Sequence, residues 1–268
     1  MSSAPGPSPG ARATAFKALH RPSHPLVLAN IYDATSAAVV AALPGTVALA
    51  TASYAVALAL GTTDEQLSLE AYLAALHPIA DVARRFNKPL SVDLQSGYGT
   101  RLEEAVRAVV RAPIAAAGVN IEDSEQRTGK MMDEDEAVAR IKRVLAVARE
   151  EKVGDLVVNA RADSFVRGGT LEESVRRGKK YLEAGATTVY IFWPEGRSEM
   201  DEEGVKFAVR ELGGMVNLAP GKLRGGGRGL TSADLKRLGV ARVSVGPSLY
   251  FAAKKALEEM AENVYKTE

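Results

Sequence analysis

The sequence contains no cysteine among its 268 residues. Disulfides, thiolate metal sites and cysteine nucleophiles are therefore excluded, and nothing indicates a secreted disulfide scaffold. Histidine is also scarce, with three residues, His20, His24 and His77. None of them follows a predicted strand, so we expect neither a histidine-based zinc site nor a serine–histidine–aspartate triad.

Two further absences concern charge and long apolar segments. Lys and Arg total 34 against 33 Asp and Glu, and the net charge of +1 gives no electrostatic signature of nucleic-acid binding. No stretch reaches the roughly 18 uncharged apolar residues that a membrane-spanning helix needs. We therefore expect a cytoplasmic protein with neither a nucleic acid nor a membrane as its partner.

The N-terminal segment is rich in Ser, Pro, Gly and Ala and lacks the apolar run of a signal peptide. This composition predicts a disordered tail over residues 1–18. No shift in composition divides the remainder, so residues 19–268 are predicted to form a single domain. That length suits one α/β barrel, which typically has roughly 250 residues.

The rest of the chain alternates short apolar runs with longer stretches of helical periodicity. Eight strands are predicted, at 26–31, 46–52, 89–94, 118–123, 156–162, 188–193, 215–219 and 241–246. Helices are predicted at 33–43, 68–86, 101–110, 133–152, 170–184, 201–212, 231–238 and 247–266, and the apolar segment 46–61 is interpreted as a buried strand and a loop.

Continuous apolar strands that alternate with helices are typical of a parallel sheet with both faces buried. Eight such units favour an α/β fold of the (β/α)8 TIM-barrel type. The alternative is an open doubly wound sheet. That fold would usually carry a glycine-rich turn after its first strand, where this chain has Asn30-Ile31-Tyr32-Asp33.

In a TIM barrel the catalytic residues lie at the carboxyl ends of the strands. Four acids and one arginine are expected there, namely Asp64, Asp93, Glu122, Asp123 and Arg161. Crowded carboxylates repel one another unless a cation or a shared proton intervenes, and oxygen ligands favour Mg²⁺ or Mn²⁺ over zinc. Arg161 offers a planar fork for a carboxylate or phosphate. The sequence therefore predicts a small anionic substrate that binds through a hard metal ion.

Helix capping is the competing explanation for acids that follow strands. Asp33 opens a predicted helix and is better explained as a cap, whereas the two explanations weigh equally for Asp123. Asp93 lies well ahead of the next helix, so a functional role is favoured there. Arg161 stands within an apolar strand and needs a charged partner or a ligand, because an unpaired buried guanidinium is costly.

Four segments resemble the phosphoenolpyruvate mutase/isocitrate lyase superfamily, in particular its carboxyphosphonoenolpyruvate phosphonomutase-like branch. They are Asn30-Ile-Tyr-Asp-Ala34, the stretch Ser53 to Asp64, Asp93-Leu-Gln-Ser-Gly-Tyr-Gly99, and Gly118-Val-Asn-Ile-Glu-Asp123 together with Asn159-Ala-Arg-Ala-Asp163. The resemblance implies a modified (β/α)8 barrel whose C-terminal helix swaps between subunits of a homodimer or homotetramer. It also implies Mg²⁺-dependent chemistry on 2-oxo acids through an enolate.

The resemblance assigns roles around the metal by position. Asp93 would be the principal carboxylate on the metal, while Asp64 and Glu122 would hold metal-bound waters. Gln95 stands where the family has a second acid, and its neutral amide would reach the metal only through water, which lowers metal affinity. Asp93, Glu122 and Arg161 would be the catalytic residues.

The resemblance also assigns the substrate contacts and a lid. The expected substrate-binding residues are Ser53, the backbone around Ala52 and Tyr54, Arg161 and Asn217. The lid is expected at residues 124–132, after the fourth strand. This segment lacks the thiol motif of isocitrate and methylisocitrate lyases, and a chain without cysteine cannot supply their thiol acid–base group.

The leading functional hypothesis is a Mg²⁺-dependent lyase that cleaves a C–C bond of a small 2-oxo or 2-hydroxy carboxylic acid, as in oxaloacetate decarboxylation. One alternative is a C–P bond enzyme, either a phosphonopyruvate hydrolase or a phosphoenolpyruvate phosphonomutase. Phe192-Trp193 stands where the mutase has a histidine, which disfavours phosphoryl migration. The other alternative is a non-catalytic family member, which the neutral Gln95 motivates.

Overall fold

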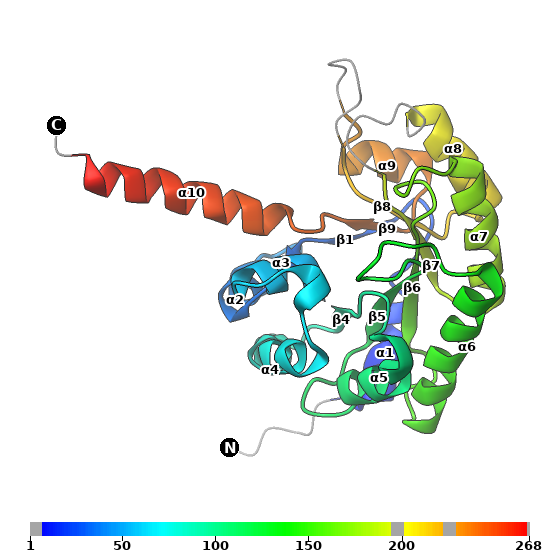
Figure 1. Cartoon of the computed structure of the whole chain (residues 1–268), viewed down its shortest axis with the longest axis horizontal. Coiled ribbons are helices and arrows are strands. Elements are labelled where there is room, and N and C mark those ends of the chain that lie inside the picture. Colours follow the sequence, from blue (N-terminus) through cyan, green and yellow to red (C-terminus); the bar gives the residue numbers. More distant parts are fainter. Residues whose placement is uncertain (1–6, 194–200, 222–228, 267–268) are drawn as a thin grey trace.

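The computed structural model of the chain is a nearly closed ring of parallel strands with helices around it (Figure 1). It describes residues 7–193, 201–221 and 229–266. The strands follow one another in the order β1-β9-β8-β7-β6-β5-β4-β3-β2. Their bounds are β1 Leu26–Leu28, β2 Asn30–Ile31, β3 Leu49–Thr51, β4 Leu90–Asp93, β5 Gly118–Glu122, β6 Val157–Ala162, β7 Thr188–Ile191, β8 Val216–Leu218 and β9 Arg242–Ser244.

The first predicted strand forms as two short strands, β1 and β2, which stand at the two ends of the strand order. β1 pairs with β9 and β2 pairs with β3, with Ala29 between the two halves. Asn30 fastens this seam, because its side-chain oxygen accepts the backbone N–H groups of Val245 and Gly246 at 3.0 and 3.1 Å. The (β/α)8 prediction is therefore confirmed, and the open doubly wound alternative is wrong.

Helices follow the strands at the predicted positions. Their bounds are α2 Ala34–Ala41, α4 Leu69–Arg85, α5 Leu102–Val110, α6 Glu134–Glu150, α7 Leu171–Glu183, α8 Glu202–Glu211, α9 Ser232–Leu238 and α10 Ser248–Tyr265, with short 3₁₀ turns η1 Asp64–Gln66 and η2 Gly99–Arg101. Asp33 caps α2, since its carboxylate accepts the N–H of Ser36 at 2.7 Å and Ser36 returns a bond to the cap. The capping interpretation of Asp33 is therefore confirmed.

Side chains alternate across the barrel wall, as the pleat of a strand requires. In β6, Val158 and Ala160 join the apolar core beneath the helices. Asn159 and Arg161 point the other way, and Asn159 bonds to Asn120 of β5 and Thr188 of β7. The interior of the barrel is thus lined in part by polar side chains that bond to one another.

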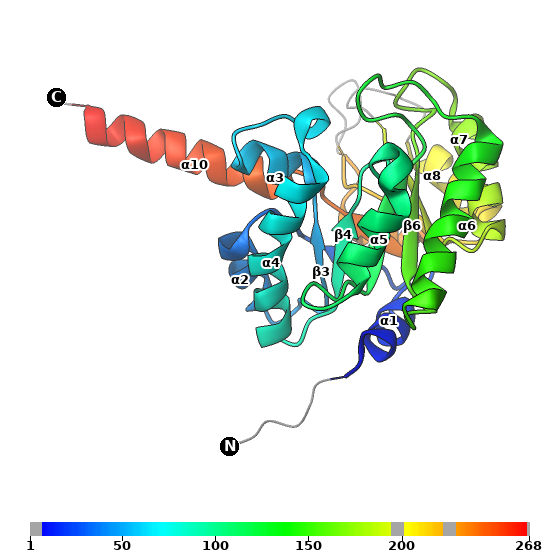
Figure 2. The same cartoon turned by 60° about the horizontal axis from the view of Figure 1, so that its bottom comes forward.

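Helix α1 (Pro9–Lys17) forms where a disordered tail was predicted, and that prediction is wrong for these residues. Residues 1–6 lie outside the described part of the chain. Ser8 caps the helix by accepting the N–H of Ala11 at 3.3 Å. Helix α1 lies at the end of the barrel opposite the strands' carboxyl termini (Figure 2). Its residue Phe16 is fully buried among residues of β1, β3 and β6. Burial of one phenyl ring stabilises the folded chain by about 2–3 kcal/mol. This gain offsets the low helix propensity of the Pro and Gly residues in the segment.

A second unpredicted helix, α3 (Ser53–Ala59), replaces the expected loop after β3. Three of its seven residues are Ala, the strongest helix former. Ala55, Val56 and Ala57 are buried, so tertiary packing supports the helix. α3 matters for the site because its first residue, Ser53, is a predicted substrate-binding residue.

Helix α10 leaves the barrel and projects away from it (Figures 1 and 2). None of its side chains is buried, although Leu257, Met260 and Val264 are apolar and 64–70% exposed. Its first turn contacts the body, where Leu249 packs against the core, Tyr250 contacts Tyr32 and Phe251 contacts Tyr54. Among the described residues, no helix combines the length and apolar character needed to cross a membrane.

Candidate active site

Three of the four predicted acids lie at the carboxyl-terminal mouth of the barrel, together with Arg161. Asp93 ends β4, Glu122 ends β5, and Arg161 stands in β6 directly opposite Glu122 in the register. Asp64 opens η1 on the loop that follows α3. Besides burial, the charge of Asp93 raises the pKa of Asp64, and the charges of Asp93 and Asp64 help to raise the pKa of Glu122, so these side chains lie near one another. The structure therefore brings together these three acids and the arginine.

Asp93 is held by the residues at the end of β3. Its Oδ2 atom accepts both the backbone N–H and the hydroxyl of Ser53, each at 3.0 Å. Its own N–H donates to Oγ1 of Thr51 at 2.9 Å, and that hydroxyl is 2.8 Å from the phenol of Tyr72. The carboxylate is thus fixed in direction, while one of its two oxygens makes none of these bonds.

Asp64 is bound by two amides. Gln95 donates its Nε2 to the Asp64 carbonyl at 2.8 Å and to Oδ1 at 2.7 Å, and Gln126 of the predicted lid donates to Oδ2. Burial, and then the charge of Asp93, raises the pKa of Asp64. A glutamate in place of Gln95 could not donate these bonds, which gives a structural reason for the amide.

Glu122 and Arg161 form a buried ion pair with an Nη1–Oε2 distance of 2.7 Å. Nε of Arg161 also contacts Asp163 at 2.5 Å. Burial raises the pKa of Glu122, whereas the charge of Arg161 lowers it and favours the ionised carboxylate. Burial disfavours the charge on Arg161, but the two carboxylates outweigh it and raise the pKa of Arg161. A guanidinium has five N–H donors, so these two contacts leave donors for a substrate carboxylate.

Asp123 does not join the acids in the mouth, which corrects that expectation. Its Oδ1 accepts the N–H of Asp163 at 2.8 Å, and its Oδ2 accepts the hydroxyl of Tyr181 at 2.5 Å and contacts Arg177 at 3.2 Å. Tyr181 and Arg177 belong to α7, on the outside of the barrel. Asp123 therefore ties the ends of β5 and β6 to a helix.

The remaining predicted substrate contacts are placed unevenly. Ser53 gives both donors to Asp93, and the N–H of Ala52 donates to Ile31 at 3.2 Å. The ring of Tyr54 is 45% exposed and lies 6.4 Å from that of Phe251 on α10. Only the backbone of Tyr54 could therefore serve the mouth.

Asn217 is fully buried in the barrel interior. Its Nδ2 donates to Ser244 at 3.1 Å, and its Oδ1 makes no hydrogen bond to any described residue. In the sheet register Asn217 lies beside Tyr190 of β7 and Arg242 of β9. A water or a ligand group could donate a hydrogen bond to this Oδ1 atom.

Arg242 was missed by the sequence reasoning. It is fully buried inside the barrel, where its weak contacts are to Ser244 and Asn120, each at 3.3 Å. Burial lowers the pKa of Arg242 to about 10, against the attraction of Asp93. The available signal was an arginine in an apolar strand, the same signal that had pointed to Arg161.

The other half of the mouth, over β7, β8 and β9, has a different character. It is an open cavity of about 820 Å³ whose main walls are Tyr190, Phe192 and Trp193. The guanidinium carbon of Arg161 lies 5.1 Å from the centre of the Phe192 ring, so the two halves meet there. The predicted lid forms a short hairpin on the acidic side, with Ser124 bridged to Met131.

Comparison with known proteins agrees with this architecture. A model of the phosphoenolpyruvate phosphomutase family matches residues 16–265. The chain belongs to this family. The resemblance to the phosphoenolpyruvate mutase/isocitrate lyase superfamily is thereby confirmed, and superfamily members are lyases and mutases.

Two curated relatives span most of the chain. An uncharacterized protein of Mycobacterium tuberculosis (strain ATCC 25618 / H37Rv) is 32% identical over 255 residues, which cover 93% of this chain and 88% of that protein. The oxaloacetate decarboxylase of Ectopseudomonas mendocina (strain ymp) is 29% identical over 253 residues, 91% of this chain and 81% of the enzyme.

Two solved structures show the same fold over nearly the whole chain. A Burkholderia cenocepacia J2315 protein with a provisional phosphonomutase name is 33% identical, with a TM-score of 0.83 over 96% of this chain and 99% of that one. A 2,3-dimethylmalate lyase of the superfamily is 25% identical, with a TM-score of 0.82 over 98% and 89% of the two chains.

The family's donor set can be tested for a divalent metal. In residues 7–193, 201–221 and 229–266, no three His, Cys, Asp or Glu side chains lie close enough together to enclose an ion. Mg²⁺ does not need such a cage, because it usually keeps several waters and binds one or two carboxylates and the substrate. The mutual repulsion of Asp93, Asp64 and Glu122 and their oxygen-only chemistry fit a hydrated Mg²⁺ on Asp93.

Proposed function

We propose that this family member is a Mg²⁺- or Mn²⁺-dependent lyase that cleaves a C–C bond of a small 2-oxo or 2-hydroxy carboxylic acid. The observation that carries the proposal is the meeting of Asp93, Asp64 and Glu122 with Arg161 at the catalytic end of the barrel. Asp93 would hold the ion, and the oxygens of Asp64, Glu122 and Gln95 would receive its waters. The relative named as an oxaloacetate decarboxylase supports this class of reaction.

The residues of the chain would act by position and charge. When bound, the metal ion would supply Lewis-acid stabilisation of the negative charge that develops on the 2-oxo oxygen. Arg161 would hold a carboxylate of the substrate and orient the bond that breaks. For oxaloacetate, the C–C bond electrons pass to the carbon next to the 2-oxo group, CO₂ leaves, and uptake of one proton gives pyruvate.

The test is an NMR time course with Mg²⁺ and a panel of acids, namely oxaloacetate, branched malates, phosphonopyruvate, phosphoenolpyruvate and 2-methylisocitrate. A mixture without enzyme corrects for the decay of oxaloacetate caused by the metal alone. We expect cleavage of a 2-oxo or 2-hydroxy diacid and survival of 2-methylisocitrate, because no thiol is present. Turnover of only the phosphonate or phosphoenolpyruvate would instead establish the C–P alternative, which the phosphonomutase-named structure favours.

The third possibility, a non-catalytic member, is separated by binding. Calorimetry with Mg²⁺, in the presence and absence of oxalate, would show no heat of binding for such a protein. Gln95, which donates hydrogen bonds to Asp64, stands where the family has a second acid that would assist the metal ion. Binding of Mg²⁺ together with oxalate would support the lyase over a protein that has lost the site.

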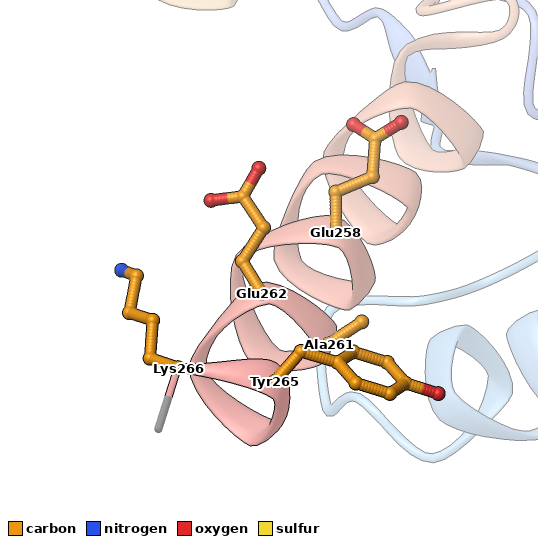
Figure 3. Close-up of a pocket in the computed structure, with 5 residues that line it drawn as sticks. All are labelled: Glu258, Ala261, Glu262, Tyr265 and Lys266. Carbon is orange, nitrogen blue, oxygen red and sulfur yellow. The ribbon is translucent and has the colours of Figure 1, made fainter. Parts of the chain in front are cut away.

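The same proposal includes a homodimer or homotetramer in which α10 packs on a neighbouring subunit. Figure 3 shows the end of α10, where Tyr265 is 84% exposed and the nearby hollow is lined by residues of this helix alone. No side chain of α10 is buried within the described part of this chain, so its apolar residues are free to pack on another subunit. Light scattering should give a multiple of 28.4 kDa, and Leu257→Glu with Val264→Glu should shift the mass toward the monomer.

A further inference from the structure

The aromatic half of the mouth, which is the cavity lined by Tyr190, Phe192 and Trp193, is larger than an unbranched four-carbon diacid requires. Its volume of about 820 Å³ lies within the roughly 300–1,000 Å³ range of sites for drug-sized ligands. The cavity is formed by the ends of β7, β8 and β9 and by the start of α9 and α10. A small diacid held by the acidic half would leave most of this space to water.

The lining of this cavity carries no charged side chain among the described residues. Its walls are apolar or neutral, with Tyr190, Phe192, Trp193, Pro220, Leu230 and Val245 as the larger side chains. The acids lie on the other side of Arg161. Such a surface favours an uncharged apolar group, because a charged group would lose hydration without gaining a partner.

The cavity begins where the guanidinium of Arg161 ends. Arg161 lies 5.1 Å from the centre of the Phe192 ring, and the rings of Phe192 and Tyr190 are 5.9 Å apart. Tyr190 also stands directly opposite Arg161 in the register of β6 and β7. A ligand whose carboxylate bound Arg161 would therefore place its next carbons against these two rings.

The far wall is held by close packing. A Cβ atom on Gly221 would lie only 3.1 Å from Nε1 and Cζ2 of Trp193, so the indole rests directly on this backbone. Gly221 is bridged to Leu230, which is 8% exposed. Trp193 is thus packed against the backbone at Gly221, whose bridge partner is Leu230.

We propose that the acid recognised by this site is a 2-oxo acid with a branched alkyl or aryl substituent, which fills the cavity of Tyr190, Phe192 and Trp193. This inference deepens the proposed function and rests on it for the binding of the carboxylate near Arg161. Tyr190, Phe192 and Trp193 then determine specificity by their shape, whereas the acidic half determines the reaction.

The chain offers a direct probe, because Trp193 is its only tryptophan. The full-length protein with Mg²⁺ is titrated with pyruvate, 2-oxobutanoate, 2-oxopentanoate, 4-methyl-2-oxopentanoate and phenylpyruvate, with calorimetry and tryptophan fluorescence as readouts. Transfer of one methylene from water to an apolar wall predicts about a fourfold fall in Kd for each added carbon. The fluorescence of Trp193 should change most with the branched and aryl members.

Variants separate the cavity from the carboxylate site. Trp193→Ala should reduce the dependence of Kd on substituent size, measured by calorimetry. Arg161→Gln should weaken all members by a similar factor and leave that dependence in place. Val39→Ala, on an exposed position of α2 outside the cavity, should match the parent protein.

The outcomes distinguish this inference from the proposed function. Equal Kd values across the series, or a rise in Kd with substituent size, would overturn the assignment of the cavity while the lyase proposal stands. If neither oxalate nor pyruvate bound in the presence of Mg²⁺, that result would contradict both the carboxylate site and the proposed function.

Discussion

The two halves of the barrel mouth differ in the chemistry of their side chains, which are charged in one half and uncharged in the other. In the acidic half, each charged group is bound by a neighbour: Ser53 donates to Asp93, two amides donate to Asp64, and Arg161 pairs with Glu122. In the aromatic half, the walls are uncharged rings that leave open space. Charges that are fixed in advance suit a reaction, since little reorganisation is needed as charge develops.

The chemistry should therefore depend on the acidic half, and the selectivity among ligands on the aromatic half. Substitutions in the acidic half should affect all ligands alike, because every ligand uses the metal and the arginine. Substitutions in the aromatic half should affect only ligands that carry a large substituent.

Asp93→Asn should have the largest effect. The amide keeps the shape of the side chain and can still accept from Ser53, but it loses the charge that would hold the metal ion. We expect kcat/KM to fall by about a thousandfold or more for every acid that the enzyme cleaves, a loss typical of removing a key electrostatic group. Initial rates at saturating Mg²⁺ measure this effect.

The matched control is Asp155→Asn. Asp155 is a half-exposed surface acid that bonds to Thr14 and Lys17 away from the mouth, so its loss should leave the rate unchanged. Full activity of Asp93→Asn would show that the metal assignment is wrong.

Arg161→Gln should have the next largest effect, on stability. It leaves Glu122 and Asp163 buried without their cation, and removal of one partner from a buried ion pair typically costs about 3–5 kcal/mol. Urea unfolding monitored by circular dichroism measures the loss. The exposed pair of Arg210 with Glu211 provides the control, since Arg210→Gln should change stability by less than about 1 kcal/mol.

An unchanged unfolding free energy for Arg161→Gln would contradict the view that the acidic half is held together by its own charges. Trp193→Ala offers the contrast within the same mouth. Trp193 is only partly buried and leaves no unpaired charge behind, so its loss should destabilise the protein less than that of Arg161.

Mg²⁺ should stabilise the folded protein through the acidic half. At a concentration ten times its Kd, one bound ion contributes about 1.4 kcal/mol, which a thermal melt with MgCl₂ or EDTA detects. Asp64 has a raised pKa in the folded protein. Without metal, its contribution to the free energy of unfolding should therefore fall as the pH rises. Mg²⁺ binds the ionised form, and the stabilisation should therefore grow between pH 5 and pH 8.

Asp93→Asn should abolish that shift in melting temperature, whereas Trp193→Ala should retain it. A metal-dependent stabilisation that was equal at both pH values would argue against Asp64 as part of the site.

The barrel and most of the acidic half could be predicted from the sequence. The strand–helix alternation predicted the barrel, and with it the placement of Asp93, Glu122 and Arg161 at one mouth. Helix α1 was missed because the burial of Phe16 depends on contacts with distant strands. The role of Asp123 was also beyond the sequence, because its partners Tyr181 and Arg177 lie more than fifty positions away.

The aromatic half shows the same limit. Phe192 and Trp193 were noted only as the residues that replace a histidine, and nothing in the sequence showed that Tyr190 and Trp193 line one cavity. The local signal for Trp193 is weak, because its close packing partner, Gly221, follows in another strand's loop. Arg242, by contrast, could have been found, since an arginine in an apolar strand demands a polar environment.

Gly221→Ala should have the smallest effect and is the sharpest test of the comparison. The backbone of Gly221 tolerates a side chain, because it does not adopt a positive φ, but the new Cβ would press on the indole of Trp193 at 3.1 Å. The indole must move by a few tenths of an ångström. That shift should raise the Kd of phenylpyruvate about threefold by spoiling its contacts, with no change for pyruvate.

Gly45→Ala is the matched control, because its Cβ would meet no atom within 4 Å. Calorimetric titration of phenylpyruvate and pyruvate against both variants measures the ratio of the two Kd values. If Gly221→Ala weakened pyruvate as much as phenylpyruvate, the acidic and aromatic halves would not act separately, because a displacement of Trp193 would then reach the carboxylate near Arg161. If the ratio alone changes, the two halves contribute independently to recognition, one through charge and the other through shape.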